Sequence, residues 1–376
     1  MKKKKILTVL GTRPEVIKLA PVIAELKKHN SRLISKVVLT GQHRTMVEQF
    51  LDLFAIKPDY DLDIMLKNQT LFDVSSRCLT RIHSVLEKEK PDLILVQGDT
   101  TTAFIAALAA FYLKIPTGHV EAGLRTYDKY RPFPEEINRQ LLSVIADLHF
   151  APTKMARGNL LKEGIDSKRI FMTGNTVIDA LHSIAKKDFK IKDEQIKNID
   201  FENKKVILVT AHRRESFGGP FKEICFALKE ISESDNVEII YPVHLNPNVQ
   251  DPVRKALGSK RNIHLLNPLD YETFVYLLRN CYLVLSDSGG VQEEAPAFGK
   301  PILVMREVTE RPEGVKSGVA KLVGMDTERI VIETKKLLFS KSAYNKMAKA
   351  VNPYGDGHAA ERIVKVIINK FRKNDI

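Results

Sequence analysis

The sequence predicts an α/β protein with two lobes, each built around a parallel sheet covered by helices. Short apolar segments of strand length alternate with longer segments of helical periodicity, and the connections are short. The alternation runs through both halves of the chain without a short-period repeat. A length of 376 residues accommodates two or three domains with cores of their own. Two Rossmann-like lobes of similar size therefore explain the pattern.

Strands and helices can be assigned in order along both lobes. In the first lobe, the predicted strands are residues 6–10, 37–40, 93–96, 117–120 and 148–151, with helices near 15–28, 44–54, 71–88, 101–113 and 134–146. In the second lobe, the predicted strands are residues 206–210, 237–241, 263–265, 283–285 and 302–305, again with helices between them. We expect a first domain over 1–172, a second over 173–355, and a C-terminal helix within 356–376 that returns to the first domain.

The composition is that of a globular protein, with 44% hydrophobic and 28% charged residues. The formal charge of +13 comes from basic residues spread over every segment, which favours solvated helix faces and an anionic substrate over a nucleic acid. No apolar run approaches a membrane span, and the longest, 104–113, predicts a buried helix. The N-terminus lacks the apolar core of a signal peptide, and Cys78, Cys225 and Cys281 form neither a metal nor a disulfide pattern. We expect a cytoplasmic protein without a metal site.

The segment from Ser286 to Gly290 predicts an anion-binding turn. It joins the predicted strand 283–285 to a helix-like segment, so free backbone N–H groups and the positive end of a helix dipole meet there. Gly289 and Gly290, beside Ser288, let a pyrophosphate approach the backbone. Further along, Glu294 could accept hydrogen bonds from ribose hydroxyls and Arg311 could meet a phosphate. The same residues also suit an ordinary turn.

The turn after the first strand carries cations rather than a dinucleotide fingerprint. Its single glycine, Gly11, precedes Pro14 at a predicted helix start, and no GxGxxG follows. Arg13 and Lys18 add positive charge near the positive end of that helix, which is unfavourable unless an anion lies between them. The alternative is that both side chains point into water.

Carboxylates follow several predicted strands of the first lobe. Asp99 follows strand 93–96, Glu121 follows strand 117–120, and Glu135 with Glu136 begins the next helix. Each acid alone suits a helix cap or first-turn position. Several at consecutive strand ends predict a carboxylate cluster suited to acid and base chemistry, because open α/β sheets bind ligands at that edge.

In the second lobe, basic residues follow two strands. His212, Arg213 and Arg214 come directly after strand 206–210 and provide up to three positive donors for an anion. His244 follows strand 237–241. A lone histidine is more often structural, but the neighbouring arginines favour an anion site over a core position.

Longer motifs run through the whole sequence from Gly11 to the C-terminal helix. In order they are GTRPEVIKLAP, GQHR, GDTTT, GHVEAGLRT, PEEINR, TGNTVIDAL, HRRES, YPVHLNPNV, SDSGGVQEEAP, ERPEG and NPYGDG. In content and order they resemble those of a known family, the non-hydrolysing bacterial UDP-N-acetylglucosamine 2-epimerases. The resemblance implies a GT-B fold with the active site in the cleft between the lobes, and a homodimer. It also implies reversible conversion of UDP-N-acetylglucosamine to UDP-N-acetylmannosamine for surface-polysaccharide synthesis, with no cofactor.

Carried over residue by residue, the resemblance implies three sets of functional residues. The catalytic set is Asp99, Glu121, Glu135 and His212. The UDP-binding set is Arg13, Lys18, His212, Phe274, Ser288, Gly289, Gly290, Glu294 and Arg311. Gln42, Arg213 and His244 match positions that hold a second, activating UDP-N-acetylglucosamine in relatives. Because Thr45 and Asn68 depart from the residues of many relatives, we expect weak or absent activation.

The chemistry implied by the resemblance suits these residues. C2 of the sugar is not next to a carbonyl, so its proton leaves only if the sugar is oxidised or if UDP departs from C1. Anti elimination to 2-acetamidoglucal and re-addition needs carboxylates near both sugar faces and cations on the pyrophosphate. Three alternatives stay open: a 2-epimerase of a related UDP-2-acetamido sugar, a GT-B glycosyltransferase, and a non-enzymatic UDP-sugar-binding protein.

Overall fold

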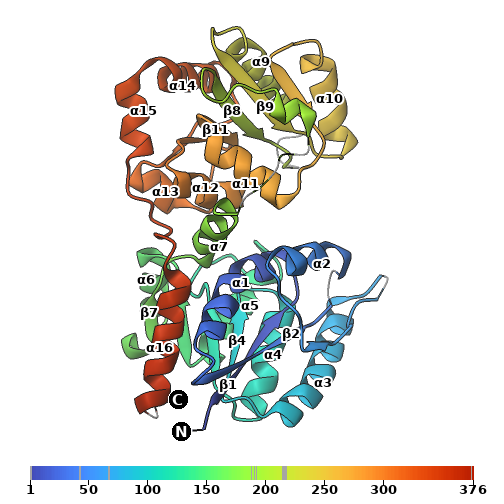
Figure 1. Ribbon diagram of the computed structural model, residues 1–376, viewed down its shortest axis with the longest axis vertical. Coiled ribbons are helices and arrows are strands. Elements are labelled where there is room, and N and C mark those ends of the chain that lie inside the picture. The colour runs from blue at the N-terminus through green and yellow to red at the C-terminus, as the bar shows by residue number, and fades with distance from the viewer. Residues whose placement is uncertain are drawn as a thin grey trace. The chain divides into compact units, whose positions relative to one another are not determined.

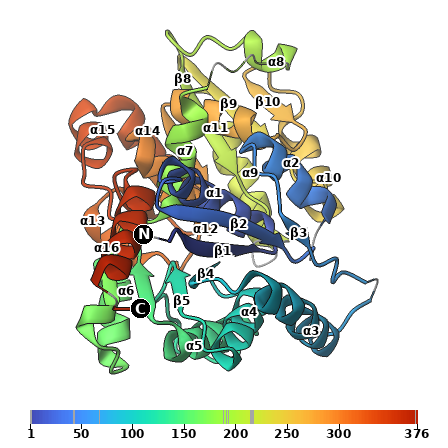
Figure 2. The ribbon, with the colours of Figure 1, turned by 60° about the horizontal axis from the view of Figure 1, so that its bottom comes forward.

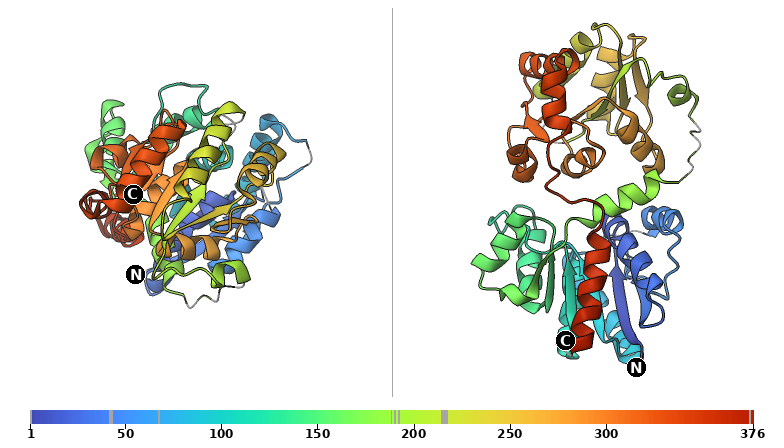
Figure 3. Two further views of the ribbon diagram at one scale, coloured as in Figure 1. Left: turned by 90° about the horizontal axis from the view of Figure 1, so that it is seen from above. Right: turned by 60° about the vertical axis from the view of Figure 1, so that its left-hand side comes forward.

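The computed structural model divides the chain into two compact units. It describes residues 2–41, 44–66, 68–187, 189, 191, 193–213, 218–373 and 375–376. Unit 1 comprises Met1–Ala180 and Tyr354–Ile376, and unit 2 comprises Leu181–Pro353. The units divide inside helix α7 (Thr176–Ala185), whereas the expected border at residue 172 falls at the end of a strand. Both termini belong to unit 1 (Figure 3).

Unit 1 contains a seven-stranded parallel sheet in the order β3-β2-β1-β4-β5-β6-β7 (Figure 1). Its strands are β1 (Lys4–Leu10), β2 (Leu33–Leu39), β3 (Tyr60–Asp61), β4 (Leu93–Gln97), β5 (Thr117–Val120), β6 (Leu148–Ala151) and β7 (Ile170–Met172). The five predicted strands are all present. The two that were not predicted, β3 and β7, are the edge strands, and they have two and three residues. Segments this short carry too little apolar pattern to be recognised.

Helices cover both faces of this sheet, with α1 and α16 on one side and α3, α4 and α5 on the other (Figure 2). The helices of unit 1 before α7 are α1 (Arg13–Lys28), α2 (Arg44–Leu53), α3 (Leu71–Glu89), α4 (Thr101–Tyr112), α5 (Glu135–Ile145) and α6 (Lys154–Lys162), with a short 3₁₀ helix η1 (Ser167–Arg169). The apolar run at 104–113 forms most of α4, as predicted, and its alanines and Ile105 are buried. No described helix is long and apolar enough to cross a membrane.

The C-terminal helix α16 (Ala359–Lys373) packs within unit 1. Its apolar stripe buries Ile363, Val364 and Ile367, and it lies against α1. At its start, the Asp179 carboxylate accepts hydrogen bonds from the backbone N–H groups of Ala359 and Ala360, at 3.2 and 2.9 Å. A carboxylate at a helix N-terminus satisfies orphan donors and complements the helix dipole.

Unit 2 contains a six-stranded parallel sheet in the order β10-β9-β8-β11-β12-β13. Its strands are β8 (Lys205–Thr210), β9 (Val237–Pro242), β10 (Ile263–Leu266), β11 (Leu283–Ser286), β12 (Ile302–Val304) and β13 (Ala320–Leu322). Its helices after α7 are α8 (Glu194–Lys197), α9 (Gly219–Ile231), α10 (Pro247–Leu257), α11 (Tyr271–Asn280), α12 (Gly289–Glu294), η3 (Ala295–Phe298), α13 (Pro312–Ser317), α14 (Thr327–Phe339) and α15 (Lys341–Ala348). The unpredicted strand β13 is again a three-residue edge strand.

Strand β8 shows why these sequences form doubly covered strands. Ile207 and Val209 pack in the core that includes α9, whereas Val206 and Leu208 pack in the core that includes α11. Successive side chains of a strand point to opposite faces, so a strand with a core on each side needs a continuous apolar run. The polar residues therefore collect where each run ends.

Candidate functional site

The β1–α1 turn of unit 1 is built around the buried carboxyl group of Glu15. It accepts hydrogen bonds from the backbone N–H groups of Gly11 and Thr12, at 3.0 and 2.5 Å, and from the Thr100 hydroxyl at 2.9 Å. Burial raises the pKa of Glu15 to about 7, although these hydrogen bonds oppose the shift. The contact with Thr100 connects this turn to the turn after β4, where Asp99 lies.

The two cations predicted for an anion at this turn have protein partners. The Lys18 ammonium forms an ion pair with the Glu121 carboxylate, and both side chains are largely buried. The Arg13 guanidinium lies over the Phe50 ring, 4.9 Å from its centroid, and its side chain is exposed. An anion does lie beside Lys18, but it is a carboxylate of the same unit, so the charge pattern alone does not require a ligand.

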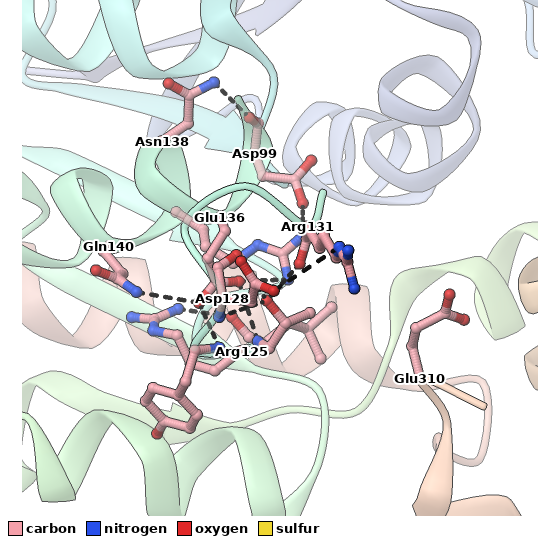
Figure 4. A network of polar contacts seen from close by, with 12 residues as sticks. Asp99, Arg125, Asp128, Arg131, Glu136, Asn138, Gln140 and Glu310 are labelled. Atoms are coloured by element: carbon pink, nitrogen blue, oxygen red, sulfur yellow. Dashed lines mark hydrogen bonds and ion pairs between the residues drawn. The ribbon is translucent and has the colours of Figure 1, made fainter. Parts of the chain in front are cut away.

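Asp99 follows β4 and is held by α5. Its Oδ2 accepts a hydrogen bond from Nη2 of Arg139 at 2.6 Å, and its backbone carbonyl accepts one from Nδ2 of Asn138 at 2.9 Å. Figure 4 shows Asp99 and Asn138 in this arrangement. Asp99 does not cap helix α4, because Thr100 is the N-cap residue and accepts from the N–H of Ala103. The structure thus removes the capping alternative for Asp99.

Glu121 directly follows β5 and adopts a left-handed backbone conformation with φ of 67°. Residues other than glycine rarely adopt this conformation, and when they do, the surrounding structure must hold them. The Lys18 ion pair supplies one such constraint, since it fixes the carboxylate while the chain turns. Because β4 and β5 are neighbours in the sheet, Asp99 and Glu121 follow adjacent strand ends.

The two acids at the start of α5 have different environments. Glu136 is fully buried, and its carboxylate accepts hydrogen bonds from the N–H groups of Thr126 and Tyr127, both at 3.0 Å (Figure 4). Burial alone would raise the pKa of Glu136, but these donors lower it below its usual value. Glu135, by contrast, has a buried Oε2 with no hydrogen-bond partner among the described residues. The Glu136 carboxylate is used by the backbone of the same unit, whereas Oε2 of Glu135 is buried without a hydrogen-bond partner among the described residues.

Two buried histidines lie behind these strand ends. His119 on β5 contacts the carbonyl of Gly98 through Nε2 at 2.7 Å, and burial lowers its pKa to about 4. His149 on β6 pairs in register with His119, and burial lowers its pKa to about 3. Both rings are therefore neutral at pH 7, and Nε2–H of His119 donates to the residue before Asp99.

In unit 2, the segment after β8 is organised by Asp287. This fully buried carboxylate accepts hydrogen bonds from the N–H groups of His212 and Arg213, at 2.7 and 2.8 Å. Its other oxygen lies 3.8 Å from Nδ1 of His212. The carboxylate thus orients the backbone and faces the imidazole of the same residue.

His212 stacks on His244, with the ring centroids 5.5 Å apart and the planes at 13°. Burial lowers the pKa of His212; Asp287 opposes the shift, while His244 and Arg213 reinforce it. The lowered pKa favours the neutral imidazole of His212. That this strand end offers up to three positive donors stays a prediction. Its neighbour Arg214 lies outside the described residues, as does Gln42 of the expected effector set.

Arg213 belongs to a second charge cluster of unit 2. Its Nη1 lies 3.5 Å from the Glu310 carboxylate, which also accepts hydrogen bonds from Arg306 at 2.9 and 3.3 Å. Burial would raise the pKa of Glu310, but the two arginines lower it to about 2. Two cations of unit 2 therefore share the Glu310 carboxylate.

The segment that we predict to bind an anion leads into helix α12, which begins at Gly289. Ser288 occupies the N-cap position, and its side chain makes no capping hydrogen bond. Neither glycine has a positive φ among the described backbone angles. A Cβ on Gly289 would lie 3.5 Å from Nη2 of Arg213, so the open flank of the helix start faces a guanidinium. The glycines therefore leave space rather than permit an unusual turn.

Three further residues of the expected UDP-binding set lie around α12. Arg311 forms an ion pair through Nε with the Glu293 carboxylate, so that edge of its guanidinium is occupied by a side chain of the same unit. Glu294 is half-buried at the end of α12. Phe274 on α11 is partly buried against the core that includes Val291. These residues come from α11, α12 and the segment before α13 of the same unit.

The folds of the two units and the polar residues at their strand ends define a class of protein before any comparison. Unit 1 is a Rossmann-like sheet with carboxylates after β4, after β5 and at the start of α5. Unit 2 is a second such sheet whose helix α12 starts beside Arg213. The described residues include no group of three or more side chains that could hold a metal ion. This is an α/β protein of the GT-B class.

Comparisons with known proteins identify the family. The family model for UDP-N-acetylglucosamine 2-epimerase matches residues 24–368. The UDP-N-acetylglucosamine 2-epimerase of Campylobacter jejuni is 53% identical over 381 residues, covering 99% of either chain. The crystal structure of the Neisseria meningitidis UDP-GlcNAc 2-epimerase bound to UDP-GlcNAc is 50% identical, with a TM-score of 0.84, and the match covers 97% of this chain and 100% of that one. The Staphylococcus aureus MnaA–UDP structure is 46% identical, with a TM-score of 0.86 and coverage of 99% and 98%. The chain belongs to the UDP-N-acetylglucosamine 2-epimerase family.

Proposed function

We propose that this protein reversibly converts UDP-N-acetylglucosamine to UDP-N-acetylmannosamine by inverting C2. The observation that carries the proposal is the set of carboxylates Asp99, Glu121 and Glu135 at consecutive strand ends and a helix start of unit 1. Unit 2 supplies a matching feature for the nucleotide, a helix start with glycines beside Arg213. The relative solved with UDP-GlcNAc bound, at 50% identity, supports the same substrate.

The proposed route is anti elimination followed by re-addition. A carboxylate removes the C2 proton, the C2–H electrons form the C1–C2 double bond, and the C1–O bond breaks with its electrons leaving on UDP. The intermediate is 2-acetamidoglucal. UDP then adds back at C1, and a proton is delivered to C2 from the opposite face. Atoms and charges balance without an oxidant, because elimination and re-addition cause no net oxidation or reduction of the sugar.

Each group has a role in this route that suits its environment. Glu121 and Asp99 are paired with Lys18 and Arg139, and Glu135 has an Oε2 atom with no described partner. One positioned acid or base contributes roughly 10²–10⁴ in rate. Cationic and backbone donors on the departing pyrophosphate contribute about 10²–10³. The proposed UDP contacts are those implied by the resemblance, including Arg13, Arg311 and the start of α12.

The proposal includes a cellular role and an assembly. The partner is a UDP-sugar, the product feeds surface-polysaccharide synthesis, and the functional form is a homodimer. Purified protein of defined oligomeric state is therefore the material for the test below.

The test is turnover of UDP-N-acetylglucosamine in D₂O without added nicotinamide, followed by proton NMR. We expect deuterium at C2 of both epimers, because the C2 proton exchanges with the solvent during elimination. Exchange-free turnover that depends on a nicotinamide would contradict the route. A product only with a related UDP-2-acetamido sugar, transfer to an added acceptor, or binding without turnover would each replace the proposed function by the corresponding alternative.

A further inference from the structure

Helix α5, which carries Glu135, makes two side-chain contacts with the segment of Asp99, and strand β5 makes a third. Nη2 of Arg139 donates to Oδ2 of Asp99 at 2.6 Å, and Nδ2 of Asn138 donates to the Asp99 carbonyl at 2.9 Å. His119 reaches the carbonyl of the preceding residue, Gly98, at 2.7 Å. The backbone and one carboxylate oxygen of Asp99 are thereby held, whereas Oδ1 makes no hydrogen bond or ion pair with the part of the chain that the structure describes.

The Arg139 guanidinium, which holds Asp99, also contacts a second carboxylate on helix α5. Nη1 of Arg139 lies 3.4 Å from Oε2 of Glu136, which is on the preceding turn of the same helix. Glu136 in turn accepts from the N–H groups of Thr126 and Tyr127 and from Nε2 of Gln140, each at 3.0 Å. Figure 4 shows Glu136 and Gln140 beside this loop. One planar guanidinium thus connects two carboxylates, which a lysine cannot do with the same geometry.

We propose that Arg139 is a positioning residue that turns Oδ2 of Asp99 toward α5 and leaves Oδ1 for the substrate. The inference rests on the proposed epimerase function, in which Asp99 is one of the catalytic carboxylates. Arg139 does not touch the substrate; it acts through Asp99 alone. The Arg139 side chain is 11% exposed, compared with 29% for Asp99 and 0% for Glu136. Asp99 is therefore the most accessible of the three residues.

A purely structural arginine would behave differently. The chain offers one for comparison in Arg169, which donates through Nε to the Asp147 carbonyl at 3.1 Å. Asp147 immediately precedes β6, so Arg169 lies at the end of the sheet opposite to the strand ends that carry the carboxylates. Replacing Arg169 by Lys removes a guanidinium from unit 1 without altering Asp99.

The test combines Arg139→Gln, Arg139→Lys, Asp99→Asn and the Arg139→Gln/Asp99→Asn double variant, with Arg169→Lys as the control. Kinetics follow C2 deuterium exchange with UDP-N-acetylglucosamine, and UDP affinity is measured by calorimetry. We expect kcat to fall about 10²-fold in Arg139→Gln, because a misplaced catalytic group costs about that much. Arg139→Lys keeps the charge but loses the fork, so its kcat should fall about tenfold. The Kd for UDP should stay within about threefold of the parent value, because only the positioning of Asp99 has changed.

The double variant decides whether Arg139 acts through Asp99. In the Asp99→Asn background, Arg139→Gln should cause no further loss of C2 exchange. The control variant Arg169→Lys, made in the parent protein, should keep the kcat of the parent. A kcat within about threefold of the parent in folded Arg139→Gln, or a loss that multiplies fully with that of Asp99→Asn, would overturn the inference.

A second measurement separates this inference from the proposed function. The urea midpoints of the two single variants and the double variant should be non-additive, because Arg139→Gln removes and Asp99→Asn weakens the same charged contact. If the parent shows no C2 exchange, the proposed function has failed, and the midpoints still decide whether Arg139 holds Asp99. Additive midpoints would overturn the inference whatever the substrate is.

Discussion

At the scale of single residues, ion pairs determine how the carboxylates of unit 1 can act. Glu121 is held by Lys18, Asp99 is held by Arg139, and Glu136 is used by backbone N–H groups. For Glu136, the backbone donors lower the pKa although burial opposes them. Glu135 differs because its buried Oε2 has no hydrogen-bond partner among the described residues. The carboxylates of unit 1 therefore have different surroundings.

The carboxylate variants Asp99→Asn, Glu121→Gln and Glu135→Gln should each lower kcat by about 10² or more. UDP affinity should stay nearly unchanged, because a group that acts in the transition state is not needed for ground-state binding. Glu121→Gln also leaves Lys18 without its anion, so its Tm should fall as well. The check is kcat by NMR beside Kd for UDP by calorimetry. Loss of UDP affinity with kcat preserved would mean that these acids bind the nucleotide instead.

The buried Glu15 predicts a pH-dependent stability. Its folded-state pKa of about 7 exceeds the ordinary value of 4.5, so the folded state binds more protons between these pH values. The stabilising contribution of Glu15 is fully present below pH 4.5 and is lost as the pH rises through 7. A shift of this size corresponds to about 3 kcal/mol.

The variant Glu15→Gln keeps a neutral side chain of the same shape at every pH. When the pH is raised from 5 to 8, the free energy of unfolding of the variant minus that of the parent should increase by up to about 3 kcal/mol. Urea denaturation at the two pH values measures this difference. Protonation of His119, whose pKa is lowered to about 4, destabilises parent and variant alike as the pH falls. Its effect therefore cancels in the difference between their free energies of unfolding. A difference that does not change with pH would contradict the prediction.

At the scale of elements, close packing at the strand ends constrains the turns that carry the site. Helices α1 and α4 both start at the carboxyl edge of the unit 1 sheet, and their first turns share contacts around Gly11. A Cβ on Gly11 would lie 2.6 Å from Oγ1 of Thr102 and 2.7 Å from Oγ1 of Thr40. Both threonines are fully buried and cannot move aside. Glycine is required here by space, not by backbone angle.

Two glycine-to-alanine variants should therefore have opposite effects. Gly11→Ala should lower the free energy of unfolding by about 1–3 kcal/mol, because it overpacks a buried turn. Gly158→Ala, inside helix α6, meets no heavy atom within 4 Å and should raise it by about 0.5–1 kcal/mol. Urea denaturation of both variants is the check. A stabilising Gly11→Ala would show that the turn relaxes more easily than the contacts indicate.

At the scale of the whole molecule, unit 1 is assembled from both ends of the chain. Helix α16 follows the whole of unit 2 in the sequence but packs on α1. It buries Ile363, Val364, Ile367 and Ile368. Each such side chain stabilises the fold by about 1.5–3 kcal/mol, and the four together approach the total stability of a typical domain. Unit 1 therefore depends on a segment that follows unit 2 in the sequence.

A chain ending at residue 355 should lose the folded state of unit 1 while unit 2 keeps its own core. Hydrogen exchange with peptide-level readout should show rapid exchange in β1, β4 and β5 and continued protection in β8 and β11. A chain ending at Lys373, which keeps all of α16, is the control and should match the parent. Full protection of β1 in the shorter chain would contradict the prediction.

Sequence pattern alone determined the two-sheet architecture and the places where polar chemistry collects. Buried parallel strands need continuous apolar runs, and the bounds of β5 and β6 agree with prediction because those runs end sharply. Edge strands β3, β7 and β13 were missed because they are both short and only partly buried, whereas β12, also of three residues, is fully buried and was predicted. The predicted positions of Asp99 and Glu121 after strands, and of Glu135 at a helix start, followed from the same reasoning.

Tertiary structure alone decided which of these side chains meet. Lys18 with Glu121, Arg139 with Asp99, and His212 with Asp287 are far apart in the sequence, and no local spacing connects them. Arg139 and Asp287 lay within motifs noted in the sequence, yet nothing in either motif showed a role. Periodicity is a property of one segment and can be read from it. An ion pair forms between two segments, so its partners are known only once the sheet brings their ends together.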